Sequence, residues 1–226
     1  MKVKQPILRI FAVISLLGSF MTPSYAAEPD NLGQLRDKLI QYHDSGNYSK
    51  DQQIAIAAAT DYLKQRLVER KKQSSAKPLA IVMDIDETVL TDYPYLLKMR
   101  FGGRLKNLCD AEGQGENPVI QPSLAFYQFA KANDVAVFFI TGRNEKYKAG
   151  STKNLKNVGF KDWDGLFMVS SNDNHALMKS FKVVTREKIE KRGYDIILNI
   201  GDQPSDLAGG HADKTIKMPN PYYFTG

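Results

Sequence analysis

Four short apolar runs, each followed directly by polar residues, dominate the sequence after residue 78. We expect them to form strands, over residues 79–83, 135–140, 165–169 and 195–200. Segments with the apolar spacing of helices follow or separate these runs, over residues 123–133, 145–158 and 185–192. Such alternation is typical of an α/β domain with a largely parallel sheet. The predicted fold class is therefore α/β, with a Rossmann-like core whose central, mostly parallel sheet is flanked by helices.

The rest of the chain predicts additions to this core. The length of 226 residues fits one domain with a small extra lobe, and the 42% hydrophobic content is enough for a core. Residues 27–78 predict an N-terminal helical segment, in which Leu32, Leu35 and Leu39 share one face. The core then spans residues 79–226. Residues 92–122 are too short for a full second domain, and we expect a flap with a small helical lid.

The first 26 residues have the layout of a signal peptide. Lys2, Lys4 and Arg9 are basic, residues 10–20 are apolar, and residues 24–26 (SYA) offer small side chains for cleavage. We expect cleavage directly after this triplet, and export to the periplasm or out of the cell. A membrane anchor is the alternative, but the apolar run is shorter than the roughly 20 residues needed to cross a bilayer.

Charge and cysteine content limit the partners. The leader contains three basic residues and no acid, so its removal lowers the formal charge from +6 to +3. The remaining Lys and Arg residues are interspersed with acids, which argues against binding of a nucleic-acid polymer. Cys109 is the only cysteine, so the exported chain has no internal disulfide, and its thiol, expected in a glycine-rich loop, is interpreted as incidental.

Polar side chains follow each predicted strand and are expected to meet. In open α/β sheets, ligands bind beyond the carboxyl ends of the strands. Those positions hold acids, hydroxyl groups, glycines and an amide, in the segments 84–88 (DIDET), 141–143 (TGR), 170–172 (SSN) and 201–206 (GDQPSD). This combination predicts a site for a cation and an anion together.

These segments carry a family resemblance. The DxDxT pattern at Asp84–Thr88, the Thr141–Gly142 pair, a later lysine and the GDxxxD pattern at Gly201–Asp206 together resemble the four motifs of the haloacid dehalogenase superfamily. The FFITGR stretch, the long block over residues 181–210 and the closing MPNPYY narrow this to its acid phosphatase branch, subfamily IIIB or class B, which includes plant vegetative storage proteins. The resemblance covers roughly residues 30–226. It implies an active phosphatase, since some storage proteins of the family lack the nucleophilic aspartate and Asp84 is present here.

The residue types agree with phosphomonoester hydrolysis. A carboxylate nucleophile splits this slow reaction into two steps through an aspartyl phosphate. Asp84, the first acid beyond its strand, is the candidate nucleophile. Asp86, two positions later, can protonate the leaving oxygen and then activate water. The family assigns the same two roles to the matching positions.

Mg²⁺ is the expected cofactor, because an anion that attacks a phosphate needs a counter-charge. Oxygen ligands suit Mg²⁺, and the candidates are the Asp84 and Asp202 carboxylates and the backbone carbonyl of Asp86, with Asp206 holding a water or supporting the others. The side chain of Thr141 and the N–H of Gly142 are candidate donors to the phosphate.

Lys182 is the predicted phosphate-binding cation. In the resemblance it takes the place of the family's lysine, in preference to Lys179, because it lies in a Phe–Lys dipeptide eleven residues before Gly193. Arg143 is either a further substrate contact or a surface ion-pair partner.

Other functions remain as alternatives. An EF-hand fails because the loop from Asp84 lacks the required Gly and the terminal Glu. A receiver domain would lack the second acid, and a dehalogenase would not need it. A non-catalytic binding or storage protein on the same scaffold is the main rival.

The expected substrate is a small phosphomonoester. A nucleoside monophosphate is one candidate, because its base could stack on Tyr93 or Tyr95 in the lid. Equally, these tyrosines could only pack the lid.

Overall fold

A computed structural model describes residues 29–72, 77–170 and 178–225. Its contacts divide the chain into two units, Met1–Asn31 and Leu32–Gly226. All helices and strands of the described residues belong to the second unit. The expected signal peptide lies outside the described residues.

The described residues form one five-stranded sheet, and its parallel pairing is as the sequence predicts. The strand order is β3-β2-β1-β4-β5, and the strands are β1 (Leu79–Met83), β2 (Ala136–Asn144), β3 (Gly165–Val169), β4 (Asp195–Gly201) and β5 (Lys214–Lys217). The strand β1 lies at the centre, where Ile81 pairs with Val137 of β2 and Leu198 of β4. Four strands were predicted within a few residues. The edge strand β5 was missed because only Ile216 among its four residues is apolar.

Two of the predicted helices begin earlier than expected. The helices of the described residues are α1 (Leu32–Asp44), α2 (Asn47–Arg70), α3 (Tyr93–Lys98), α4 (Leu105–Gln114), α5 (Gln121–Lys131), the 3₁₀ helix η1 (Glu145–Tyr147), α6 (Lys148–Val158), α7 (Met178–Lys191) and α8 (Pro204–Leu207). The start of α7 is seven residues before the expected one, so Lys182 lies inside a helix. Cys109 lies in α4 rather than in a loop.

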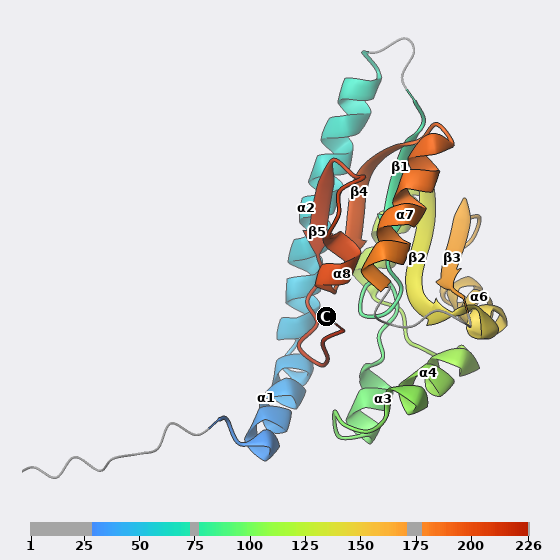
Figure 1. Cartoon of the computed structure of the whole chain (residues 1–226). Helices are drawn as coiled ribbons and strands as arrows, with labels where there is room; N and C mark the ends of the chain where they lie inside the picture. The colour runs from blue at the N-terminus through green and yellow to red at the C-terminus, as the bar shows by residue number, and fades with distance from the viewer. Residues whose placement is uncertain (1–28, 73–76, 171–177, 226) are drawn as a thin grey trace, which may run out of the picture. The chain divides into compact units, whose positions relative to one another are not determined.

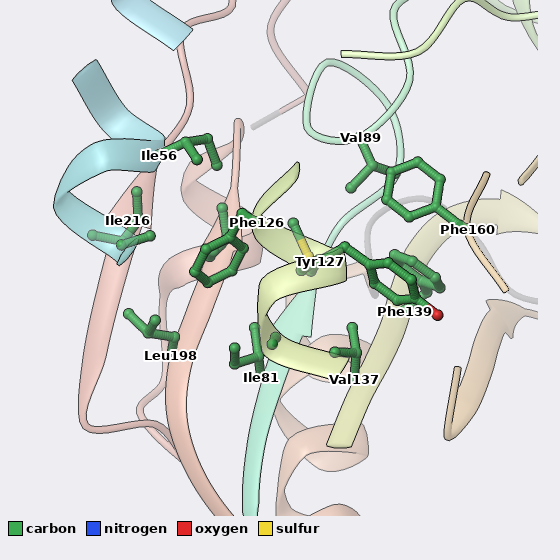
Figure 2. Close-up of a cluster of buried hydrophobic side chains, with 14 of the residues drawn as sticks. Ile56, Ile81, Val89, Phe126, Tyr127, Val137, Phe139, Phe160, Leu198 and Ile216 are labelled. Carbon is green, nitrogen blue, oxygen red and sulfur yellow. The ribbon is translucent and has the colours of Figure 1, made fainter. Parts of the chain in front are cut away.

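One face of the sheet packs against α2 and α5. Figure 2 shows Ile81 and Val137 from the sheet facing Phe126 and Tyr127 of α5, with Ile56 of α2 beside them. Alternate residues of β1 point to this face. All five residues of β1 are buried, as expected of a strand that is covered on both faces. This cluster is the main core.

The opposite face is covered by α7. Ala80 and Val82 of β1 pack with Phe138 of β2 and Ile189 of α7 in a second, smaller core cluster. The sheet is therefore the middle layer of three, and its buried strands place their carboxyl ends at one common edge.

The two N-terminal helices, α1 and α2, are buried to different extents. Gly46 has a φ of +82°, a left-handed conformation suited to glycine, and it separates α1 from α2. Leu63 of α2 is fully buried in the main core. Of the shared leucine face of α1, only Leu39 packs against a cluster, whereas Leu32 and Leu35 are exposed. No helix in the described part of the chain is long and apolar enough to cross a membrane.

Two short helices, α3 and α4, lie beyond the carboxyl ends of the strands (Figure 1). Both fall within residues 92–122, the segment expected to form a lid, and we refer to this segment as the lid. The lid helix α4 touches α6 backbone to backbone: a Cβ on Gly150 would overlap the carbonyl oxygen of Gly113, and a Cβ on Gly115 would lie 2.5 Å from the carbonyl oxygen of Gly150. Glycines at these positions allow the lid to pack closely.

We expect Gly150→Ala to destabilise the protein by about 1–3 kcal/mol, because the added methyl group separates α4 from α6. Helix propensity alone predicts the opposite sign, a gain of roughly 0.5–1 kcal/mol. Urea unfolding monitored by circular dichroism would decide between them. Lys156→Ala, on an exposed position of the same helix, serves as the control. A Gly150→Ala protein more stable than the unsubstituted chain would contradict the close packing.

Candidate active site

Two neighbouring strands place acids at the same edge of the sheet. Asp84 follows β1 directly and Asp202 follows β4, and the N–H of Asp84 donates to the carbonyl of Ile200 at 2.9 Å. Both carboxylates are buried. The strand ends thus fix these two acids close together, as the sequence predicts.

Lys182 supplies the opposite charge from α7. Its Nζ donates to Asp84 Oδ1 at 2.8 Å and also to Asp206 Oδ1. The other oxygen of Asp206 accepts from the backbone N–H of Gln203 at 2.8 Å. Lys182 is 5% exposed, so its ammonium group is held for these carboxylates rather than for solvent.

Burial makes the ionised form of these acids energetically unfavourable. Burial, and then the neighbouring acids Asp206 and Asp202, raise the pKa of Asp84 well above its usual value despite the opposing effect of Lys182. Burial, followed by Asp206, raises the pKa of Asp202 to about 7. Burial alone would lower the pKa of Lys182, but Asp84 and Asp206 outweigh it and raise that pKa. The cluster is therefore stabilised by taking up a proton or by binding a cation.

The donor set fits a divalent cation. Carboxylate oxygens of Asp84, Asp202 and Asp206 lie within 4.8 Å of one another. Lys182 donates to two of these three acids, and hard oxygen ligands of this kind are what Mg²⁺ binds. Both oxygens of Asp206 already accept protein hydrogen bonds. This geometry favours the supporting role for Asp206.

The end of β2 brings Thr141 and Gly142 to the same edge. Thr141 Oγ1 accepts the N–H of Arg143 at 3.1 Å, so its hydroxyl proton is free to be donated elsewhere. A Cβ on Gly142 would lie 3.1 Å from the methyl carbon of Met178. Gly142 therefore lies at a place where a side chain fits poorly.

Arg143 pairs with the second acid of the DxD pattern. Its Nε donates to Asp86 Oδ1 at 3.0 Å and to Oδ2 at 3.1 Å, and its Nη2 lies 2.5 Å from Oδ1. Its Nη1 donates to Ser151 Oγ at 3.1 Å. The guanidinium is fully buried and lies 3.9 Å from a carboxylate oxygen of Glu112. Arg143 is thus a buried ion-pair partner rather than a surface one.

A second acid group, made of Asp86, Asp92 and Glu112, surrounds this arginine. Burial, and then Asp86, raise the pKa of Glu112 to about 8, against the lowering effect of Arg143. Arg143 already supplies the positive charge of this group. We therefore interpret it as an ion-pair cluster and not as a second cation site.

Both acids of the DxD pattern open into a cavity of about 380 Å³. Lys182, Gly142 and Asp202 line its polar side. The apolar part of its lining comes from the lid and the C-terminal segment, with Leu96, Met99, Phe101, Leu108, Tyr222 and Phe224. The cavity therefore joins a charged floor to an aromatic wall.

In the part of the chain that the structure describes, the lid tyrosines Tyr93 and Tyr95 do not line this cavity. The ring of Tyr93 stacks on His43 with a centroid distance of 3.4 Å, and Tyr93 is buried. Among the aromatic residues, Phe101 and Tyr222 take the place expected of the tyrosines: both line the cavity, and their rings stack with centroids 5.6 Å apart. Ser171 and Asn172, predicted beyond the third strand, lie outside the described residues.

A family model described as HAD superfamily, subfamily IIIB (Acid phosphatase) matches residues 25–226. The chain belongs to this family. Similar curated proteins include Acid phosphatase 1 of Solanum lycopersicum, 33% identical over 147 residues, and the Stem 28 kDa glycoprotein of Glycine max, 35% identical over 149 residues. Each match covers 63% of this chain but only 58% and 59% of the relatives' own lengths.

The family fold agrees with the sheet described above. The class C acid phosphatase from Bacillus anthracis superposes with a TM-score of 0.69 at 21% identity, covering 85% of this chain and 86% of that one. At this identity the likeness shows the fold alone. The haloacid dehalogenase resemblance and the α/β fold class predicted from the sequence are both confirmed.

The sequence reasoning missed several neighbours of the acids in this acid phosphatase family member. Glu112 was not singled out, because nothing in its local sequence signals burial beside Arg143. Gln203 and Asn220 both donate to Asp202, at 2.5 and 2.6 Å. The Pro–Asn–Pro sequence around Asn220 could have indicated a turn near the site. It was used only as part of the family resemblance.

We expect Arg143→Met to destabilise the protein by about 3–5 kcal/mol at pH 8, because it leaves buried acids without a counter-charge. When an acid has a higher pKa in the folded protein than in the unfolded chain, the free energy of unfolding falls as the pH rises between these two pKa values. Glu112 follows this rule between about pH 4.5 and about 8. Removal of Arg143 raises the upper limit further, so the destabilisation should shrink at pH 5.

Thermal and urea unfolding at pH 5 and pH 8 would measure this difference, with Arg100→Met at an exposed position as the control. An equal loss of stability at both pH values would show that Arg143 acts by packing and not by charge.

Proposed function

We propose that this chain is a metal-dependent phosphomonoesterase that acts through a phosphorylated Asp84. The observation that carries the proposal is the contact of Lys182 with Asp84 at 2.8 Å inside a cavity that Asp86 and Asp202 also line. A carboxylate beside a fixed ammonium group, facing an open cavity, is suited to accept a phosphoryl group.

Asp84 is the proposed nucleophile and Asp86 the proposed acid and base. An oxygen of Asp84 bonds to phosphorus while the bond from phosphorus to the leaving oxygen breaks, and Asp86 gives its proton to that oxygen. In the second step Asp86 takes a proton from water, whose oxygen displaces Asp84 from phosphorus. Lys182, Thr141 and the N–H of Gly142 hold the phosphoryl oxygens throughout.

Mg²⁺ is the proposed cofactor. The carboxylates of Asp84 and Asp202 and the backbone carbonyl of Asp86 would hold it, with Asp206 in support. When bound, it orients the phosphate and neutralises the charge that develops on it.

The proposed substrate is a small phosphomonoester with an aromatic or apolar leaving group, such as a nucleoside monophosphate. The aromatic wall of the cavity supports this choice, because a flat ring can stack on Phe101, Tyr222 or Phe224 while the phosphate meets the charged floor. We propose that the protein works outside the cytoplasm, in accord with its leader-like N-terminus.

We expect Asp84→Asn to abolish release of phosphate from aryl and nucleoside phosphates while the fold is retained, because an amide cannot form the phosphorylated intermediate. Chelation of divalent cations should likewise stop the unsubstituted enzyme, and added Mg²⁺ should restore it. Phosphate release and near-ultraviolet circular dichroism would test both points.

Asp61→Asn, at an exposed position of α2, is the matched control and should keep full activity. If the unsubstituted chain released no phosphate from any monoester in the presence of Mg²⁺, a binding or storage role would replace the enzymatic one.

We expect Phe224→Ala to raise KM for p-nitrophenyl phosphate by about 2- to 10-fold, because one aromatic contact with the substrate is lost. The KM for glycerol phosphate should change little. Phe224 is 74% exposed, so the substitution should not disturb folding. Val184→Ala removes an exposed apolar side chain that does not line the cavity and serves as the control. Equal effects on both substrates would exclude stacking by Phe224.

A further inference from the structure

The C-terminal segment, residues 218–225, is bonded to the end of β4. The N–H of Met218 donates to the carbonyl of Gly201 at 2.8 Å. The side chain of Gln203 donates to the carbonyl of Tyr223 at 3.4 Å and accepts the N–H of Thr225 at 3.1 Å. The segment is therefore fixed beside Asp202.

Asn220 makes the central contact of this segment. Its Nδ2 donates to Asp202 Oδ2 at 2.6 Å, and its Oδ1 accepts the N–H groups of Tyr222 at 2.9 Å and Tyr223 at 3.4 Å. An Asn side chain that bonds the backbone two residues later forms an Asx turn. Because the amide oxygen is used by the turn, the amide N–H₂ must face the carboxylate.

Two amide groups thus converge on one oxygen of Asp202. Gln203 Nε2 lies 2.5 Å from Oδ2 and Asn220 Nδ2 lies 2.6 Å from it. Hydrogen bonds to a charged acceptor are stronger than neutral ones and fix its orientation. With Oδ2 held by the protein, Oδ1 is the oxygen that can serve a cation.

We propose that Asn220 is a positioning residue for the cation site. It fixes the Asp202 carboxylate for Mg²⁺ and links cation binding to the backbone of Tyr222 and Tyr223, which line the substrate cavity. The inference rests on the proposed function, since it concerns the same cation. It adds that the C-terminal segment is part of the site and not only a wall.

Calorimetric titration of the full chain with MgCl₂ tests this without any turnover. Asn220→Ala should weaken Mg²⁺ binding by about 10- to 100-fold, the usual effect of losing a group that orients a metal ligand. Asn220→Ser should do the same, because its hydroxyl can keep the turn but is too short to reach Asp202.

Asn154→Ala is the matched control. Asn154 is a buried amide that bonds the backbone of Asn117 at 2.8 and 2.9 Å, and neither residue lines the cavity. This variant should lose thermal stability and keep its Mg²⁺ affinity. A merely structural role for Asn220 would produce the same pattern.

Nuclear magnetic resonance of the unsubstituted chain keeps the test independent of how the variants fold. The side-chain amide of Asn220 and the backbone amides of Tyr222 and Tyr223 should shift together as MgCl₂ is added, with one half-saturation point. Unshifted resonances, or Asn220 variants whose Mg²⁺ affinity stays within twofold of the unsubstituted chain, would overturn the inference and leave the proposed enzyme intact. Absence of any Mg²⁺ binding to the unsubstituted chain would overturn the metal dependence as well.

Discussion

The repulsion among buried carboxylates at the end of β1 and β4 governs this structure. Two carboxylates about 4 Å apart repel by roughly 4 kcal/mol at an effective dielectric constant near 20. The oxygens of Asp84, Asp202 and Asp206 lie within 4.8 Å of one another, and Lys182 is the ammonium that contacts two of them. The hydrophobic layers on both faces of the sheet must therefore hold an edge that its own charges tend to open.

The same repulsion explains why this edge suits a reaction that gathers negative charge. The raised pKa of Asp84, from burial and then from Asp206 and Asp202, means that the isolated cluster tends to take up a proton. A bound cation competes with that proton, because metal ligands must be deprotonated. Cation binding and ionisation of the proposed nucleophile are thus linked.

Much of this arrangement could be predicted because it follows the chain locally. Asp84 and Asp202 come directly after apolar runs, so the parallel sheet alone brings them together. The partners of these acids could not be predicted in the same way. Arg143 of β2 meets Glu112 of α4 from 31 residues away, and Asn220 reaches Asp202 from 18 residues away. The strand β5 escaped prediction because it is mostly exposed and has a single buried side chain.

The loop between Asp84 and Thr91 shows how distant elements stabilise the site. Glu87 has a φ of +50°, which is unfavourable for a residue with a side chain. Its buried carboxyl accepts the hydroxyl of Tyr48 and the N–H of Asp92, the latter at 2.6 Å. These bonds offset the backbone strain of the loop that carries both acids of the DxD pattern. Since Tyr48 belongs to α2, this helix supports the loop that follows the proposed nucleophile as well as the core.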